Sequence, residues 1–141
     1  MVDSGGARMS VYAVGQELTP QTFIINRALL VGYANASGDQ NPIHQNEEFA
    51  KSVGLENVIA HGMFTMALAG RYLSSIAGSA AVKEFSARFT KPVVVPADTD
   101  VELIVSGKVV EVLDGAIKIE VSATCNDIKV LGMSKAVVAI R

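Results

Sequence analysis

The 141-residue sequence predicts an α+β fold in which an antiparallel β-sheet wraps around one long buried helix. Two observations predict it. The stretch from Gly62 to Ile76 is apolar on nearly every side, which is typical of a buried helix. After Gly78, apolar and polar residues alternate, as in strands with one apolar face. Such strands need a cover for that face, and the 62–76 helix is the long apolar segment that can supply it.

The chain is short enough to form one domain around one core. No linker or internal repeat divides it, so we expect a flexible terminus over residues 1–10 and a single domain over 11–141. Apolar residues make up 50% of the chain and charged residues 18%, which excludes a disordered chain. A monomer this apolar would have difficulty covering its surface, and the composition therefore favours an oligomer.

The first half is predicted to hold one short strand and two short helices. β-branched and aromatic residues indicate a strand over 21–25. Asn26 has the side chain of an N-cap and precedes a helical pattern over 27–36. Asn46 is expected to cap a second helix, which Gly54 ends.

The second half is predicted to be strands joined by tight turns. Asp114-Gly115 and Asn126-Asp127 are the residue types of two-residue hairpin turns. Pro92 and Pro96 interrupt the alternation, which indicates an edge or a bulge between strands. The expected strands cover residues 84–90, 101–109, 117–125 and 128–140.

Charge and cysteine content exclude several functional classes. There are 12 basic and 14 acidic residues, a net charge of −2, and no basic run, so we expect no nucleic-acid and no membrane-surface partner. The lone Cys125 excludes an internal disulfide framework, and no Cys/His cluster has zinc spacing. With no leader-like apolar stretch at the start, the sequence predicts a cytoplasmic protein.

The residues that indicate chemistry lie between Tyr33 and Met63, a segment that contains both histidines of the chain. Asp39 and His44 are a carboxylate and an imidazole five positions apart. Pro42 prevents a regular helix between them, so a turn must bring them together. On these residues alone, Asp39 is equally well explained as a turn former that bonds its own backbone, and His44 as a half-buried structural histidine.

The motifs YANASGDQNPIH (33–44) and IAHGM (59–63) make the catalytic interpretation specific. This pattern resembles the hydratase motif of the MaoC-like (R)-specific enoyl-thioester hydratases and dehydratases, which have a hotdog fold. The resemblance extends from about Val14 to the C-terminus. Within the family the chain is most similar to the catalytic subunit of the mycolic-acid-type (3R)-hydroxyacyl-ACP dehydratases.

Position by position, the resemblance implies that Asp39 and His44 form a catalytic dyad and that the Gly62 amide stabilises an oxyanion. Supporting or substrate-binding roles are expected for four further residues: Asn41, Ser37, His61 and Met63. The chemistry needs no cofactor and no metal.

The implied reaction is reversible hydration of a trans-2-enoyl thioester to a (3R)-hydroxyacyl thioester, carried on ACP or CoA, and we expect it to be the dehydration step of fatty-acid elongation. A second hotdog subunit is the expected partner, with a heterodimer preferred to a homodimer. Two alternatives stay open: a hotdog acyl thioesterase, and a non-catalytic acyl-binding subunit of a hotdog heterodimer.

Overall fold

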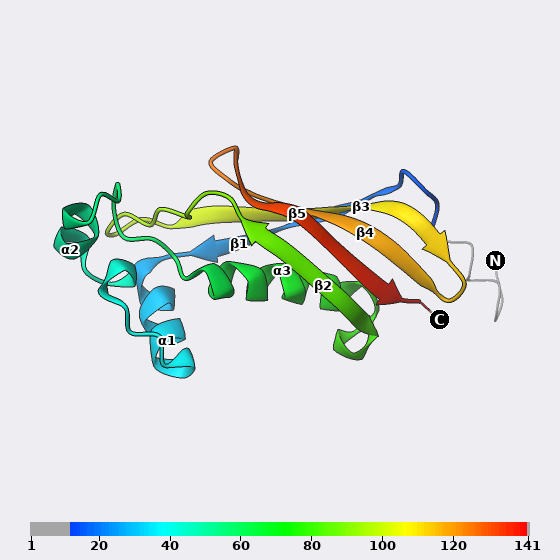
Figure 1. Ribbon diagram of the computed structural model, residues 1–141, viewed down its shortest axis with the longest axis horizontal. Coiled ribbons are helices and arrows are strands. Elements are labelled where there is room, and N and C mark those ends of the chain that lie inside the picture. Colours follow the sequence, from blue (N-terminus) through cyan, green and yellow to red (C-terminus); the bar gives the residue numbers. More distant parts are fainter. Residues whose placement is uncertain (1–11, 141) are drawn as a thin grey trace.

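The computed structural model describes residues 12–140, so the flexible terminus predicted for residues 1–10 lies outside the described part. One antiparallel sheet curves around one long helix, with the shorter helices at one end of the sheet (Figure 1). The elements in chain order are β1 (Glu17–Ile25), α1 (Arg27–Ser37), the 3-10 turn η2 (Pro42–His44), α2 (Glu47–Ser52), α3 (Gly62–Ala77), the 3-10 turn η3 (Ser79–Ala81), β2 (Val82–Phe89), β3 (Val101–Leu113), β4 (Ala116–Cys125) and β5 (Ile128–Ala139).

The sheet has five strands in the order β1-β3-β4-β5-β2, which confirms the predicted fold class. Both predicted hairpin turns are present, and their backbones need the left-handed conformation that the sequence supplies. Gly115 has φ 79°, while Asn126 and Asp127 have φ 54° and 62°. Along β4, every second residue from Ile117 to Cys125 is buried, as the alternation predicts.

The helix α3 is buried on one side only, whereas the sequence indicated burial all round. Its buried residues face the sheet: Thr65, Leu68, Ala69, Tyr72 and Leu73. The side chain of Met63 is 57% exposed and Ala67 is also exposed. A single sheet can cover only one side of a helix, so this chain leaves an apolar helix face open.

The first strand and the turn before β2 differ from the prediction. The first strand begins at Glu17, four positions earlier than expected, and its start was missed because Pro20 lies in a register shift that breaks the alternation between Leu18 and Gln21. The turn η3 precedes β2, where the sequence indicated strand alone. Within residues 12–140, no helix is both long and apolar enough to cross a membrane.

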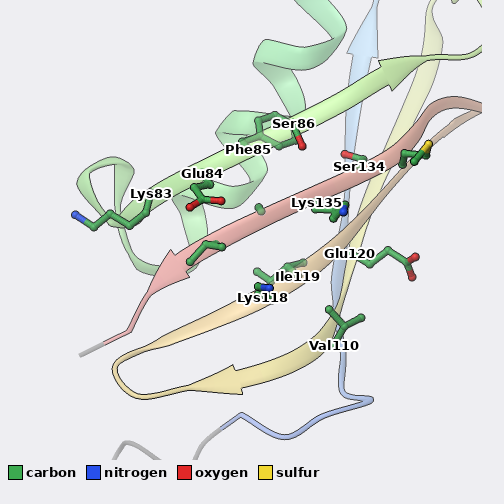
Figure 2. Close-up of a pocket in the computed structure, with 13 residues that line it drawn as sticks. Lys83, Glu84, Phe85, Ser86, Val110, Lys118, Ile119, Glu120, Ser134 and Lys135 are labelled. Carbon is green, nitrogen blue, oxygen red and sulfur yellow. The ribbon is translucent and has the colours of Figure 1, made fainter.

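A hollow of about 820 Å³ lies along β2, β5 and β4 (Figure 2). Charged side chains of both signs line it, among them Lys118, Glu120 and Lys135. None of the residues that the sequence singles out for chemistry belongs to its lining. This hollow is therefore separate from the candidate site described below.

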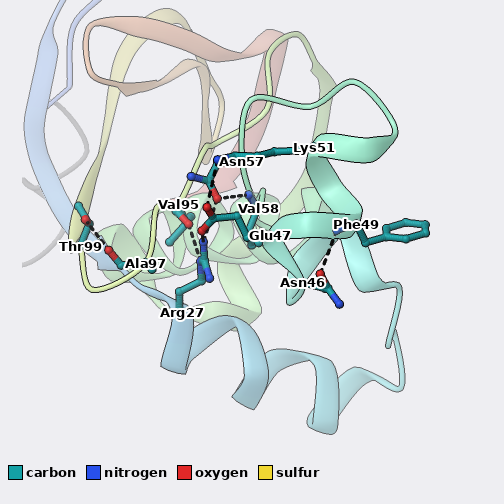
Figure 3. Close-up of polar contacts among 10 residues, drawn as sticks. All are labelled: Arg27, Asn46, Glu47, Phe49, Lys51, Asn57, Val58, Val95, Ala97 and Thr99. Carbon is teal, nitrogen blue, oxygen red and sulfur yellow. Dashed lines mark hydrogen bonds and ion pairs between the residues drawn. The ribbon is translucent and has the colours of Figure 1, made fainter.

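The Arg27 guanidinium ties together the segments that flank the predicted catalytic turn (Figure 3). Its Nε donates to the carbonyl oxygen of Val95 at 2.6 Å, and its Nη2 donates to Asn57 Oδ1 at 2.9 Å. The same nitrogen lies 3.2 Å from a carboxylate oxygen of Glu47. The half-buried Arg27 side chain thus links the start of α1 to α2, to the loop at Asn57 and to the segment at Val95.

Replacing Arg27 with methionine should keep the aliphatic stem and lose these bonds. We expect a loss of about 2 kcal/mol in the free energy of unfolding, because the Val95 carbonyl and the Asn57 amide lose a charged donor. Urea denaturation measures the loss. The matched control is Lys51→Met, since Lys51 contacts Glu47 in an exposed pair that contributes little. Equal stability of the two variants would contradict the prediction.

Candidate active site

The segment between α1 and η2 is a turn held by its own side chains. The helix α1 ends at Gly38, which has φ 85° and donates its amide to the Ala34 carbonyl. The amide of Asp39 then donates to Ser37 Oγ at 3.2 Å, and Asp39 Oδ1 accepts the amide of Asn41 at 3.2 Å. One carboxylate oxygen of Asp39 is therefore used by the turn, as the structural interpretation of Asp39 predicted.

The second carboxylate oxygen of Asp39 faces His44. Asn41 Oδ1 accepts the amide of Ile43 at 3.1 Å and so caps the 3-10 turn that Pro42 begins. This turn places His44 Nε2 4.0 Å from Asp39 Oδ2, and the Asp39 side chain is 51% exposed. The structural and catalytic interpretations of Asp39 are compatible, because each uses a different oxygen.

The partner of His44 fixes which nitrogen carries the hydrogen. His44 is buried, and its Nδ1 lies 2.8 Å from the carbonyl oxygen of Ile59. A carbonyl oxygen can only accept, so Nδ1 donates. In the neutral ring, Nε2 then carries a lone pair directed to the side of Asp39, which is the form a general base needs.

Burial lowers the pKa of His44 below its usual 6.5. The Ile59 carbonyl opposes this shift, the neighbouring His61 adds to it, and the Asp39 carboxylate opposes it. Burial is the largest of these effects, and it disfavours the charged ring. The pKa therefore stays below 6.5, and His44 is neutral at pH 7.

His61 lies against His44 inside the protein. The two rings stack with centroids 3.8 Å apart, and the Tyr33 ring meets His61 edge-on at 4.8 Å. His61 Nε2 is 3.1 Å from the backbone carbonyl oxygen of Asp39. The sequence offered His61 as a supporting residue, and this contact with the Asp39 backbone is not visible in any sequence pattern.

Gly62 is the first residue of α3, and its amide has no partner inside the helix. A pocket of about 300 Å³ contains both Gly62 and His44, together with apolar residues from the strands and the connecting loop. The Phe89 ring lies close over the glycine, since a Cβ there would be 3.1 Å from two of its atoms. The pocket thus combines an imidazole base with a helix N-terminus that favours negative charge.

The structure brings Asp39, His44, His61 and Gly62 together, whereas Met63 points elsewhere. Met63 is more than half exposed. Of the residues that the sequence singled out, the pocket lining contains His44 and Gly62 and does not contain Ser37, Asp39, Asn41, His61 or Met63. Sequence reasoning missed Phe89, Thr65 and Ile59, all of which line the pocket. The alternation in β2 placed Phe89 on the apolar face but did not indicate which helix position it would meet.

Asp39, His44 and His61 each offer one ligand atom within 4.8 Å of the others, a spacing that a metal site can have. The stacked rings have planes only 24° apart, and the nitrogen lone pairs lie in those planes. Lone pairs that lie in two stacked, nearly parallel planes do not converge well on one ion. We therefore assign no metal to these residues.

Comparison with known proteins finds a match to a family model described as "MaoC like domain" over residues 10–126. A 3-hydroxyacyl-thioester dehydratase X of Mycobacterium tuberculosis is 44% identical over 73 residues, which are 52% of this chain and 25% of that protein. A solved MaoC-like dehydratase is 34% identical with a TM-score of 0.90, covering 94% of this chain and 42% of that chain. The R-hydratase PhaJ1 from Pseudomonas aeruginosa is 25% identical with a TM-score of 0.79, covering 93% of this chain and 84% of that one. The matches to curated relatives span between 21% and 54% of their lengths.

Proposed function

Because this chain belongs to the MaoC-like domain family, we propose that it catalyses the reversible hydration of trans-2-enoyl thioesters to (3R)-hydroxyacyl thioesters. The observation that carries the proposal is the pocket whose lining contains both His44, with Nε2 free of any backbone partner, and Gly62 at the start of α3. The thioester is carried on CoA or on ACP, and dehydration during fatty-acid elongation is the direction we favour.

In the hydration direction, His44 acts as the base. The 4.0 Å between His44 Nε2 and Asp39 Oδ2 is too long for a direct hydrogen bond, but it leaves room for a water that bonds both atoms. Nε2 takes a proton from this water as its oxygen bonds to the β-carbon of the substrate. Asp39 orients the water, and Asn41 and Ser37 hold the turn that aims the carboxylate.

The electrons of the carbon–carbon double bond then move toward the thioester, and negative charge develops on its oxygen. The Gly62 amide at the start of α3 is placed to stabilise this charge. A proton returns from the His44–Asp39 pair to the α-carbon. The sum is the addition of one water, with hydroxyl on the β-carbon and hydrogen on the α-carbon.

The test follows the ultraviolet absorbance of crotonyl-CoA together with free thiol. Hydration removes the conjugated enoyl absorbance and releases no thiol. Release of thiol would instead identify a thioesterase, and no change in either signal, alone or with a partner subunit, would identify a non-catalytic acyl-binding subunit.

The pH dependence should follow His44. As a base it must be neutral, and its pKa lies below 6.5, so kcat/KM should stay level near pH 7 and fall on the acid side with a midpoint below 6.5. In the unfolded state His44 binds a proton more readily than in the folded state. Its contribution to stability is therefore present above pH 6.5 and is lost as the pH falls through the pKa of His44 in the folded protein.

Two measurements check this. The pH profile of crotonyl-CoA hydration gives the midpoint, and NMR titration of His44 gives its pKa directly. In Asp39→Asn, which removes a carboxylate that raises the pKa, the titration midpoint should move further down. A His44 midpoint above 6.5 in the wild-type protein would contradict the assignment.

We infer that a second hotdog subunit covers the open side of α3. Exposed apolar residues lie there and on α1, among them Met63, Leu29 and Val31. The match to the solved MaoC-like dehydratase covers only 42% of that longer chain. This difference in length supports a second subunit beside the present chain. A heterodimer with a partner that lacks the dyad is preferred to a homodimer.

Light scattering of the chain purified alone, paired with assays on short and long enoyl thioesters, separates the two assemblies. A poorly active chain that a co-expressed hotdog subunit rescues supports the heterodimer. A stable homodimer with full activity on crotonyl-CoA and no response to a partner would overturn that preference.

A further inference from the structure

The turn that carries the dyad continues from α1 and is attached to the rest of the protein at two further points. Ser37 Oγ and Asp39 Oδ1 accept its local hydrogen bonds, and Gln40 Nε2 donates to Asn35 Oδ1, so these bonds tie the turn to α1 alone. At the His44 end, Ile59 provides two bonds: its carbonyl accepts His44 Nδ1, and its amide donates to the Ile43 carbonyl. The His44 end is therefore anchored independently of Asp39.

At the Asp39 end, the anchor is His61. The hydrogen bond between His61 Nε2 and the Asp39 carbonyl oxygen links residues 38–41 to the N-cap of α3, and it is the one bond that does so within the described chain. The carbonyl can only accept, so Nε2 carries the hydrogen and Nδ1 of the neutral ring is bare. Nδ1 is buried and has no partner among residues 12–140, so the side chain makes its hydrogen bond through Nε2.

We propose that His61 is a positioning residue, which holds the Asp39 end of the turn against the N-terminus of α3 through its Nε2–H bond to the Asp39 carbonyl. The backbone of the same residue begins α3, because its carbonyl accepts the amides of Phe64 and Thr65. His61 thereby sets the position of the Asp39 carboxylate relative to the amide of Gly62, the residue that follows His61 in the chain. The inference rests on the proposed function, since it assigns the geometry of that site.

Loss of this bond should act on kcat more than on KM. His44 stays anchored by Ile59, while the Asp39 backbone loses its bond to the residue before Gly62 and can shift relative to His44 and Gly62 as far as its bonds within the turn allow. A misplacement of about 1 Å in a reacting group costs on the order of 10²-fold in rate. The substrate pocket itself does not include His61, so substrate binding should change little.

Two substitutions separate the hydrogen bond from the ring. His61→Gln places an amide N–H near the position of Nε2 and removes the ring, whereas His61→Phe keeps an aromatic ring against His44 and Tyr33 and removes the donor. With crotonyl-CoA, we expect kcat of His61→Phe to fall by about 10²-fold with KM nearly unchanged, and kcat of His61→Gln to recover to within about 5-fold of wild type. A Phe variant with wild-type kcat, or a Gln variant as slow as Phe, would overturn the proposal.

A measurement on the wild-type protein covers the case in which a buried substitution prevents folding. Nitrogen NMR spectra of the ring should show His61 with its hydrogen on Nε2 and His44 with its hydrogen on Nδ1. A His61 ring with its hydrogen on Nδ1 would overturn the proposal without any variant.

Amide hydrogen exchange separates this inference from the proposed function. The amide of Asn41 should exchange faster in His61→Phe than in wild type and His61→Gln, because the turn loses its anchor. If the wild-type protein hydrates crotonyl-CoA neither alone nor with a partner subunit, the proposed function fails, and the exchange rates still test the anchor. Equal exchange at Asn41 in all three proteins would reject the anchor even if hydration is observed.

Discussion

Asp39→Asn and His44→Asn should each abolish most of the hydration of crotonyl-CoA while the protein stays folded. Asparagine at position 39 keeps an oxygen for the Asn41 amide and removes the charge that orients the water. Asparagine at position 44 can place an N–H near Nδ1 for the Ile59 carbonyl, but it has no base at the Nε2 position. General acid–base catalysis contributes about 10²- to 10⁴-fold, so we expect losses of that size.

Alanine at these two positions should have different effects on stability. The Asp39 side chain is half exposed, and its truncation removes only a turn contact. His44 is buried, stacks on His61 and bonds the Ile59 carbonyl, so His44→Ala leaves a cavity and an unpaired carbonyl. The asparagine variants therefore give the cleaner test of catalysis.

The matched control is Gln40→Ala. Gln40 lies in the same turn, is exposed, and bonds only the side chains of Asn35 and Gln45. Its activity should equal that of wild type, and thermal unfolding followed by circular dichroism checks that all variants are folded. Full activity in His44→Asn would eliminate the dyad, and a slow Gln40→Ala would show that the turn responds to any substitution.

Most of the fold was predictable because caps and turns depend on residue types only a few positions apart, which can be seen in the sequence. The turns at Gly115 and Asn126-Asp127 need left-handed backbone, and their residue types indicated it directly. Asn26 caps α1 by accepting the amide of Leu29, as its position predicted. The burial of α3 was overestimated. The residue pattern shows which faces of the helix are apolar, but it does not show how many of them the rest of the chain can cover.

The candidate site was predictable only in part, for a related reason. The residue types of the turn placed Asp39 near His44, and the motif around Gly62 marked the start of α3. The contacts of Phe89 with Gly62 and of His61 with Asp39 join segments that are 27 and 22 positions apart. No local signal encodes such contacts, since they depend on how the sheet curves around the helix.

Gly62→Val should reduce turnover by about 10²-fold or more if the Gly62 amide is the main oxyanion donor. A side chain at this position would project into the pocket beside the amide and crowd the thioester oxygen. The structure adds a second consequence, because even a Cβ would lie 3.1 Å from the Phe89 ring. The ring would have to move, so the variant alone does not separate a lost oxyanion site from a displaced Phe89.

The double variant Gly62→Val/Phe89→Ala separates these causes. Removing the ring makes room for the valine, so a loss that came only from the clash with Phe89 should be recovered relative to Phe89→Ala alone. We expect the loss to persist, because the new side chain still crowds the oxygen that the amide must reach. Turnover of crotonyl-CoA in the four proteins of this cycle measures the coupling. Wild-type turnover in Gly62→Val would remove the Gly62 amide from the mechanism, and full recovery in the double variant would assign the glycine to packing against Phe89.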